Sequence, residues 1–416
     1  MSDKKVDFLH ETRLSTTDAE GHRVYLHPED VQGKFRTRRT IFYTLLIFIY
    51  LILPWIHIDG KQSILIDITH REFTFFGFTF FGHDIPLLFF ILTLWVFAFA
   101  FITAVWGRVW CGFACPQTVF IDAIFSRIER WIEGKARQRK ELEKAPWTLQ
   151  KFFKKTFKWL LFLLVSLHIV HSFLGYFVGT RRLFWMSLHS PLDNWGVFVA
   201  MLIGVAIVLL DFGWFREQFC IIVCPYGRIQ SVMMDENSLV VAYDTKRGEP
   251  RRSVGVSRDA EGDCINCFAC VKVCPTGIDI RNGTQLECIA CTACMDMCDE
   301  IMLKVGKPQG LIRYDSENNL KGGGKKIFTG RILVYLAVIT LLLGGLIYSL
   351  RHQTILDVVY TRSKNPYQII SRSDSDPVIM NQLQVHLSYN IQESTNISIR
   401  TSTLSSSDLE IIAPAS

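Results

Sequence analysis

The sequence predicts a membrane α-helical bundle of five transmembrane helices, with an inserted cysteine-rich soluble domain and a short C-terminal β segment. The chain has 416 residues, of which 49% are hydrophobic and 13% aromatic. The apolar residues are concentrated in five blocks long enough to cross a bilayer. All twelve cysteines lie between positions 111 and 298, a distribution that indicates ligands rather than a disulfide scaffold.

The five apolar blocks define the predicted spans. They cover residues 41–58, 85–105, 159–178, 195–210 and 332–350. The fourth is extended by aromatic residues around Asp211. Residues 59–84 alternate between polar and apolar and predict a short hairpin at the membrane interface. The first block begins only at Ile41 and lacks a small-residue cleavage site, so we expect no removable signal peptide.

Loop charge predicts the orientation of the bundle. Residues 107–155 carry eleven Lys and Arg, whereas 59–84 and 179–194 carry two each. Cytoplasmic loops are enriched in Lys and Arg, so the N-terminus, with its basic flank up to Arg39, and the cysteine-rich segment are expected inside. The same distribution argues against nucleic-acid binding, because the basic residues that give the net charge of +6 flank the spans.

These boundaries predict five regions. They are a cytoplasmic N-terminal segment (1–40), four transmembrane helices (41–215), a cytoplasmic soluble domain (216–326), a fifth transmembrane helix (327–350) and an outer β-rich segment (351–416).

Eight cysteines form two quartets with the same spacing. Each quartet reads Cys-x2-Cys-x2-Cys-x3-Cys, the first starting at Cys264 and the second at Cys288. In bacterial ferredoxins, three such thiolates hold one 4Fe-4S cluster and the fourth holds the other. We therefore predict a bacterial two-cluster ferredoxin-like domain. The predicted ligands are Cys264, Cys267, Cys270 and Cys298 for cluster one, and Cys288, Cys291, Cys294 and Cys274 for cluster two.

Two alternatives account less well for these quartets. A structural zinc site uses two pairs of cysteines rather than two quartets, and disulfide frameworks belong to oxidising compartments. One departure from the ferredoxin pattern is that Asp299, rather than proline, follows the last cysteine.

The outer segment carries strand signals. Residues 384–389 and 396–400 alternate between polar and apolar, which is typical of half-buried strands. The segment is shorter than the roughly 100 residues of an immunoglobulin-like sandwich. The sequence therefore predicts a partial immunoglobulin-like β segment.

The four remaining cysteines form a repeat at the ends of two spans. Trp110-Cys111-x3-Cys115-Pro follows the second span, and Phe219-Cys220-x3-Cys224-Pro follows the fourth. Cysteines at i and i+4 share one helix face, and a following proline ends the helix by restricting the residue before it.

Because these pairs recur at equivalent places, we expect the four sulfurs to converge on one metal or redox site at the cytoplasmic side. Soft thiolates prefer copper(I), zinc or iron–sulfur. Inert buried thiols, or a duplication without chemistry, remain the alternatives.

Histidines supply weaker metal candidates. His168 and His171 lie at i and i+3 in the third span, where ionisable residues are functional candidates as haem or copper ligands or proton carriers. Interhelical hydrogen bonding explains them equally well. Four further histidines fall on the outer side and are either metal-accessible or simply solvated: His57, His70, His83 and His189.

Several segments together resemble one known family. They are GRVWCGFACPQTV at 107–119, REQFC at 216–220, CPY at 224–226, RGEPR at 247–251, CPTGIDIR at 274–281 and GLIRY at 310–314. This pattern resembles the cytochrome c oxidase accessory protein family, called CcoG, FixG or RdxA, from about residue 24 onward. The tail looks shorter than the outer immunoglobulin-like domain of that family.

The resemblance implies a multi-pass protein of the bacterial inner membrane, with a cytoplasmic N-terminus and a periplasmic C-terminus, needed to assemble cbb(3)-type cytochrome oxidase. It further implies reduction of copper(II) to copper(I), with copper as substrate and Cys111, Cys115, Cys220 and Cys224 as the candidate site. The implied partners are membrane lipid, a cytoplasmic electron donor, a copper transporter or chaperone and oxidase assembly factors, and an oligomer is compatible.

Two rival functions remain. An electron-transfer subunit, similar to the membrane polyferredoxins of periplasmic nitrate reductase systems, would pass electrons to a partner without binding copper. A non-enzymatic assembly scaffold would use its clusters only structurally.

Overall fold

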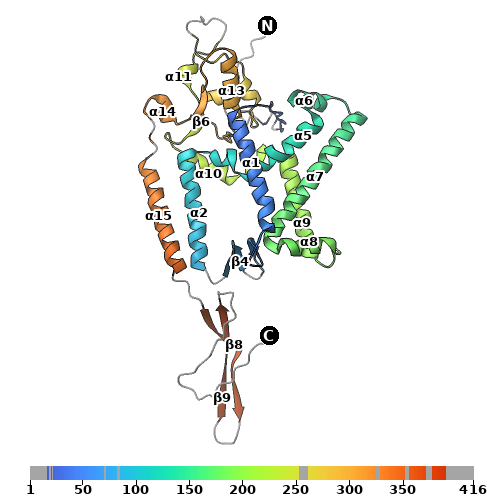
Figure 1. Cartoon of the computed structure of the whole chain (residues 1–416), viewed down its shortest axis with the longest axis vertical. Coiled ribbons are helices and arrows are strands. Elements are labelled where there is room, and N and C mark those ends of the chain that lie inside the picture. The colour runs from blue at the N-terminus through green and yellow to red at the C-terminus, as the bar shows by residue number, and fades with distance from the viewer. Residues whose placement is uncertain are drawn as a thin grey trace. The chain divides into compact units, whose positions relative to one another are not determined.

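The computed structural model describes residues 16–17, 20, 22–69, 72–81, 85–252, 261–324, 326, 328–351, 356–371 and 377–389. The chain divides into two compact units, 1–347 and 348–416. The first unit holds the long helices and the cysteine-rich segment together (Figure 1).

Each of the five predicted spans contains a long α-helix, although the first, predicted over 41–58, ends as a helix at Ile52 and continues into a 3₁₀ turn (Leu53–Trp55) and a short strand (His57–Ile58). The five spans correspond to α1 (Lys34–Ile52), α2 (Ile85–Trp106), α7 (Leu149–Val178), α9 (Trp195–Val208) and α15 (Gly330–Arg351). Helices α1 and α7 begin earlier than predicted. Their first turns are polar and are therefore not detected by hydropathy, but in the fold these turns form hydrogen bonds with other segments. At α1, the carboxylate of Asp296 accepts hydrogen bonds from the backbone N–H groups of Phe35, at 3.1 Å, and Arg36, at 2.7 Å. A distant aspartate thus satisfies the free donors that begin this helix.

A sixth segment is long and apolar enough to cross a membrane, by length and composition: Val109–Glu133. The expected count of five spans is therefore one short of the six candidates among the described residues. The segment consists of α3 (Val109–Phe113), α4 (Pro116–Phe120), a π-helical turn (Ile121–Phe125) and α5 (Ser126–Glu133). Its breaks and its charges lower its apparent hydropathy, and the sequence alone therefore predicts a loop here.

Packing of this sixth segment forms the core of the bundle. Phe120, Phe125 and Ile121 pack against Phe162 of α7 and against Phe212 of a second π-helical stretch, Leu209–Phe215. The ring centroids of Phe125 and Phe162 are 4.8 Å apart. These residues come from three separate segments of the chain, so their contact depends on tertiary packing.

Charged residues near this core are buried and paired. Glu129 of α5 is 1% exposed and contacts Arg139 of α6 (Ala136–Lys144) at 3.1 Å, Lys158 at 3.5 Å and Arg216 at 3.0 Å. Glu133 contacts the same Lys158 at 2.8 Å. Basic residues such as Arg139, which contribute to the predicted orientation through the charge of the 107–155 loop, therefore also have a structural role. They neutralise buried carboxylates, which would be costly to bury unpaired.

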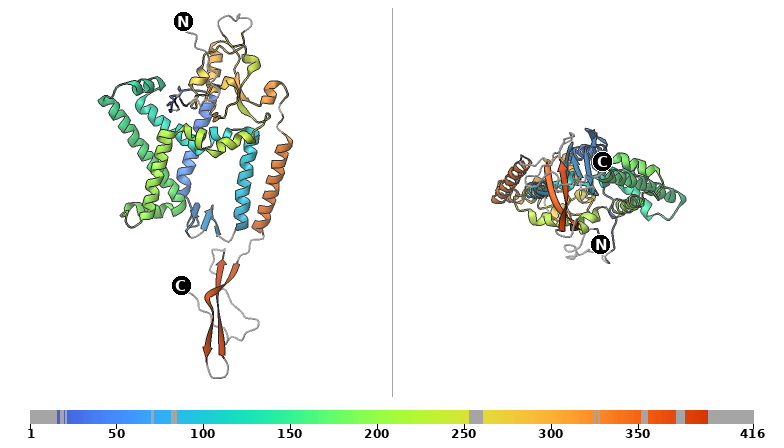
Figure 2. Two further views of the ribbon diagram at one scale, coloured as in Figure 1. Left: turned by 180° about the vertical axis from the view of Figure 1, so that it is seen from behind. Right: turned by 90° about the horizontal axis from the view of Figure 1, so that it is seen from below.

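The predicted hairpin between the first two spans is present and larger than expected. It comprises β1 (His57–Ile58) paired with β2 (Lys61–Gln62), and a three-stranded antiparallel sheet of β3 (Ile64–Asp67), β4 (Glu72–Phe75) and β5 (Phe78–Phe81). Figure 2 shows these strands at the end of α1 and α2 that is far from α13.

The cysteine-rich segment is closed by an antiparallel pair of strands, β6 (Val240–Tyr243) and β7 (Ile312–Asp315). Between them lie α11 (Thr245–Gly248), α12 (Ala269–Lys272), a 3₁₀ turn (Ile280–Asn282) and α13 (Ala293–Lys304). Helix α10 (Pro225–Met233) leads in, and α8 (Thr180–Leu188) and α14 (Glu317–Lys321) complete the first unit. Pairing β6 with β7 brings the two ends of the segment together, as an insertion between two spans requires.

The described part of the second unit is a single antiparallel hairpin of β8 (Leu356–Ser371) and β9 (Pro377–Tyr389). The strand predicted at 384–389 lies within β9. The strand predicted at 396–400 lies outside the described residues.

Candidate iron–sulfur and thiol sites

The two cysteine quartets share the same backbone conformation. In the first quartet, Asn266 and Phe268 have left-handed φ angles of 58°, and in the second Ala290 and Thr292 have 51° and 61°. These residues flank the second cysteine of each quartet. Non-glycine residues rarely adopt this conformation, and such strain concentrates at functional sites. Alternating right- and left-handed residues turn successive N–H groups inward, a geometry found at many iron–sulfur sites.

Each quartet contributes to two cavities of similar size. The first cavity, about 360 Å³ including its mouth, is lined by Cys264, Cys267, Cys270 and Cys298. The second, about 350 Å³, is lined by Cys274, Cys288, Cys291 and Cys294, and also by Cys270, which the two cavities share. Each cavity thus combines three cysteines of one quartet with the last cysteine of the other, which is the grouping that the crossed assignment predicts.

The arrangement suits a cluster better than a single ion. Among the described residues, no three His, Cys, Asp or Glu side chains meet closely enough to hold one metal ion. The cysteines of each cavity instead surround a volume, and four thiolates around a volume are the donor set of a 4Fe-4S cluster. The residues present therefore fit two such clusters.

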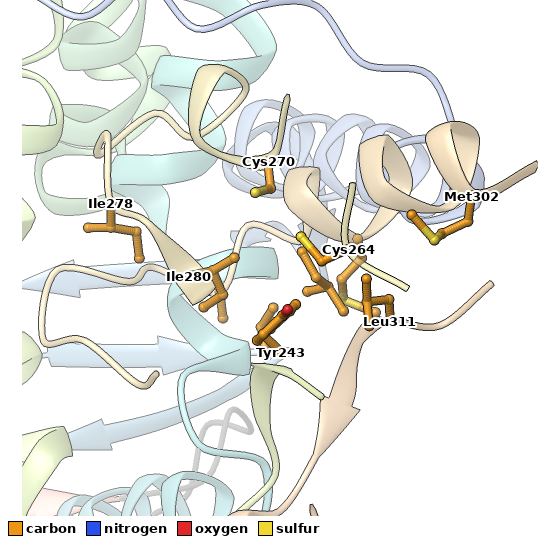
Figure 3. Close-up of a cluster of buried hydrophobic side chains, with 11 residues drawn as sticks. Tyr243, Cys264, Cys270, Ile278, Ile280, Met302 and Leu311 are labelled. Atoms are coloured by element: carbon orange, nitrogen blue, oxygen red, sulfur yellow. The ribbon is translucent and has the colours of Figure 1, made fainter. Parts of the chain in front are cut away.

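The cavities are walled by apolar side chains. Cys264 and Cys270 lie in a buried cluster with Tyr243, Leu311 and Met302 (Figure 3). Burial also raises the pKa of the Cys288 and Cys291 thiols to about 11. Because metal ligands must be thiolates, iron binding here has to displace thiol protons that are otherwise retained at neutral pH.

Arg281 places a positive charge at the first cavity. Its side chain is buried, lies 4.1 Å from the ring centroid of Phe268 and donates to Asp279 at 2.6 and 2.8 Å. It also lines the cavity itself. Charge beside a cluster is one of the factors that set its reduction potential, and the cysteine motif alone does not reveal the Arg281–Asp279 ion pair at this cavity.

The first Cys-x3-Cys-Pro motif differs from its predicted form. Cys111 lies in α3, but Cys115 has extended backbone, with φ −64° and ψ 125°, and precedes α4. The expectation of two cysteines on one helix that Pro116 terminates is therefore wrong. Pro116 begins the next helix, where its missing N–H costs nothing, and its ring holds Cys115 extended.

The second motif repeats this geometry. Cys220 lies in a π-helical turn, Phe219–Val223, and Cys224 precedes Pro225 of α10 with φ −65° and ψ 112°. The sequence repeat is therefore a structural repeat at the level of the backbone.

The four thiols lie in one neighbourhood. Gln230 of α10 is fully buried, and its amide Nε2 lies 3.3 Å from the sulfur of Cys111. Cys220 is within electrostatic reach of Cys111, Cys115 and Cys224. The two motifs thus share one half-buried region, which we call the thiol site.

The thiol site abuts the second cavity. Gly112, next to Cys111, packs so closely on the loop 289–290 that a Cβ at this position would collide with the Ala290 carbonyl oxygen. Arg39 bridges the two sides, because it donates to the carbonyl oxygens of both Gly112, at 3.2 Å, and Cys291. Arg108 donates to the carbonyl oxygen of Cys288 at 2.8 Å.

Arg39, Arg108 and Gln230 contact the two sites through hydrogen bonds that sequence reasoning missed. Arg39 reads in the sequence only as part of a basic flank, yet it is 3% exposed. The only sequence signal is that Arg39 and Arg108 lie immediately beside apolar spans. The enrichment of Lys and Arg in cytoplasmic loops already accounts for basic residues at these positions.

A larger cavity borders both the thiol site and the loop of the second cavity. It has about 850 Å³ of space including its mouth and is lined by both Cys220 and Cys291. Its walls carry arginines and carboxylates, among them Asp122 and Glu217. The cavity wall beside Cys220 is therefore charged.

The histidine candidates lie elsewhere. His168 and His171 line a different cavity with His189, towards α8. His70 and His83 lie outside the described residues. Asp211 accepts a hydrogen bond from Gln117 at 2.9 Å.

Several apolar helices and two four-cysteine cavities define a membrane-associated iron–sulfur redox protein with two clusters. Two family models match: a 4Fe-4S dicluster domain over residues 215–317 and a 4Fe-4S binding domain over residues 87–137. The second match contains only Cys111 and Cys115, too few ligands for a cluster of its own. No solved structure matches the chain significantly.

Three curated relatives cover nearly all of the chain. Protein RdxB of Cereibacter sphaeroides is 38% identical over 91% of this chain and 81% of its own length. Protein RdxA of the same organism is 34% identical over 88% and 79%. The nitrogen fixation protein FixG of Rhizobium meliloti is 32% identical over 90% and 78%. The chain belongs to this FixG/RdxA/CcoG family.

Proposed function

We propose that the protein is a cupric reductase that reduces copper(II) to copper(I) at the thiol site for the assembly of a cbb(3)-type cytochrome oxidase. The observation that carries this proposal is the direct packing of the first thiol motif on the second cavity. Gly112 touches the loop that ends in Cys291, and Arg39 hydrogen-bonds to both.

The cysteines have distinct roles in this proposal. Cys264, Cys267, Cys270 and Cys298 hold one cluster, and Cys274, Cys288, Cys291 and Cys294 hold the other, which lies nearer the thiols. When bound, these clusters supply one electron at a time. Arg39 and Arg108 fix the loop of the second cavity against α3, so the distance between the two redox sites stays constant.

The thiol site supplies the chemistry for copper. A cupric ion enters through the charged cavity beside Cys220, gains one electron and becomes cuprous. Thiolates are soft ligands that favour copper(I) over copper(II), so Cys111, Cys115, Cys220 and Cys224 stabilise the reduced product. Gln230 keeps Cys111 oriented towards its partners.

One observation favours a second candidate. The match of residues 87–137 to a 4Fe-4S binding domain fits a thiol site that relays electrons to a membrane partner without copper. In that case the protein is an electron-transfer subunit that receives electrons from a cytoplasmic donor.

A double substitution tests the copper proposal. In Cys220→Ser/Cys224→Ser, both clusters should assemble, because no cluster ligand is changed. Electron flow to copper should fall at least about tenfold, since serine is a hard, poorly ionised ligand that holds copper(I) weakly. The measurement is the reoxidation rate of dithionite-reduced clusters after copper(II) is added at low concentration.

The control for direct oxidation of exposed clusters is wild-type protein at the same copper concentration. Reoxidation of the double variant at the wild-type rate, with intact clusters, would contradict the proposal and favour the electron-transfer subunit.

We further propose that the protein lies in the bacterial inner membrane with the cysteine-rich segment in the cytoplasm and residues 351–416 in the periplasm. A reporter fused after Gly324 should give a cytoplasmic signal, and one fused after Asp357 a periplasmic signal, because of the Lys and Arg imbalance between loops. If both fusions report the same side, α15 does not cross the membrane. Oxidase assembly factors and a copper transporter or chaperone are the partners that this orientation would serve.

A further inference from the structure

A large cavity lies between α7, α8 and α9, away from the cysteines. It has about 950 Å³ of space including its mouth. Its lining combines apolar side chains, Ser187 and Asn194 with three imidazoles and two thioethers: His168 and His171 of α7, Met186 of α8, His189 after α8, and Met201 of α9. Helix α8, which contributes Met186, lies at the end of α7 opposite to α5 and α6 (Figure 1).

The walls of this cavity are held by close packing. Gly204 of α9 approaches α7 so closely that an added Cβ would lie 2.7 Å from Val170 Cγ1. Thr180, at the start of α8, donates to the carbonyl oxygen of Pro54 at 3.0 Å. The three helices therefore present His168, His171 and Met201 from a fixed frame.

His189 is already in the tautomer that a metal ligand needs. Its Nδ1 lies 2.7 Å from the carbonyl oxygen of Trp185. A carbonyl only accepts, so Nδ1 carries the hydrogen and Nε2 retains its lone pair. Metal-binding histidines typically donate their other ring N–H to a carbonyl or carboxylate in this way.

The donor set selects the class of metal. No Asp or Glu is among the residues that line the cavity, so hard cations such as Mg²⁺ and Ca²⁺ find no carboxylate. Imidazole suits zinc, copper, iron and nickel, whereas thioether sulfur selects copper(I). Copper is the metal that both donor types share.

We propose that this cavity is a copper-binding site separate from the thiol site and built from His168, His171, His189, Met186 and Met201. The imidazoles do not yet meet at one point, since no three such ligands among the described residues converge on a single ion. Copper binding draws them together by side-chain rotation, for which the unbranched methionines are well suited. Binding here requires neither the clusters nor the thiols, so it does not rest on the proposed function.

The test uses the full chain in detergent and copper(I) as the probe. Competition with a chromogenic copper(I) chelator should show that His168→Leu/His171→Leu binds one copper(I) fewer per chain than the wild type, or binds it at least tenfold more weakly. His189→Gln, which changes a single exposed side chain, should weaken the same site in a protein with normal cluster content. Copper(II) bound to the wild type should show nitrogen couplings in its EPR spectrum, and these should be lost in the double variant.

His57→Gln is the matched control. His57 also hydrogen-bonds through Nδ1 to a backbone carbonyl, that of Trp55 at 2.9 Å, but it does not line the cavity. This variant should bind copper like the wild type. The Cys220→Ser/Cys224→Ser protein should keep the histidine site, so failure of the thiol proposal and failure of this one give different results.

Two outcomes would overturn the proposal. One is wild-type copper(I) stoichiometry and affinity in both the His168→Leu/His171→Leu and the His189→Gln proteins. The other is unchanged copper binding together with weaker binding of a quinone analogue, which would make the cavity a quinone site.

Discussion

Cys298→Ser is expected to remove the same cluster as Cys264→Ser, although the two cysteines belong to different quartets. Both side chains line the first cavity, and a 4Fe-4S cluster that loses one thiolate is assembled poorly or lost. Total iron should fall from about eight to about four atoms per chain in either variant. Iron analysis and low-temperature EPR of the reduced proteins provide the measurement.

The reciprocal pair supplies the control for general misfolding. Cys274→Ser and Cys288→Ser should share one spectrum, that of a protein without the second cluster, because both residues line the second cavity. A spectrum common to Cys264→Ser and Cys274→Ser, with Cys298→Ser resembling Cys288→Ser, would show that each quartet holds its own cluster.

Glu129→Gln should destabilise the bundle strongly, by about 3–5 kcal/mol, because it leaves buried cations without their counter-charge. Glu129 is the shared partner of Arg139, Lys158 and Arg216. The last of these precedes the second thiol motif, so the loss should also loosen that motif. The midpoint of thermal unfolding in detergent, followed by cluster absorbance and by helical circular dichroism, measures the effect.

Glu141→Gln provides a matched control on the neighbouring helix α6. Glu141 forms an ion pair with Arg137 at 2.9 Å, but their side chains are 63% and 91% exposed. Exposed pairs contribute little because water and salt screen them. Equal midpoints for the Glu129 and Glu141 variants would mean that the buried network has no special stabilising role.

The spacing of the cysteines is sufficient to predict much of the iron–sulfur site. Local spacing decides which thiols can reach one cluster, because three cysteines at x2 intervals lie on a single loop. Hydropathy likewise predicts a long helix in each of the five spans, since a helix satisfies its backbone hydrogen bonds within one segment, although it does not mark the end of the first helix at Ile52. Both signals are contained in short stretches of chain.

The sequence misplaces a helix boundary where the same local pattern is compatible with two structures. Proline after Cys115 predicts a helix end, but Pro116 begins a helix, because the tertiary fold continues through α4 into the π-helical turn. The positions of the apolar blocks predict a loop between spans at 107–155, whereas Val109–Glu133 forms helical segments that are long and apolar enough to cross a membrane, and its carboxylates Glu129 and Glu133 are paired with cations from α6 and α7.

What the sequence determined by itself is therefore the presence of two four-cysteine motifs typical of 4Fe-4S clusters, the existence of the long helices and the repeat of the thiol motif. Only the tertiary structure decided that Arg39 joins Gly112 to Cys291, that Gln230 contacts Cys111, and that His189 shares a cavity with His168 and His171. These relations connect residues that are far apart along the chain or on different helices. Spacing and periodicity describe the arrangement of neighbours along one segment, whereas these contacts depend on how separate segments pack.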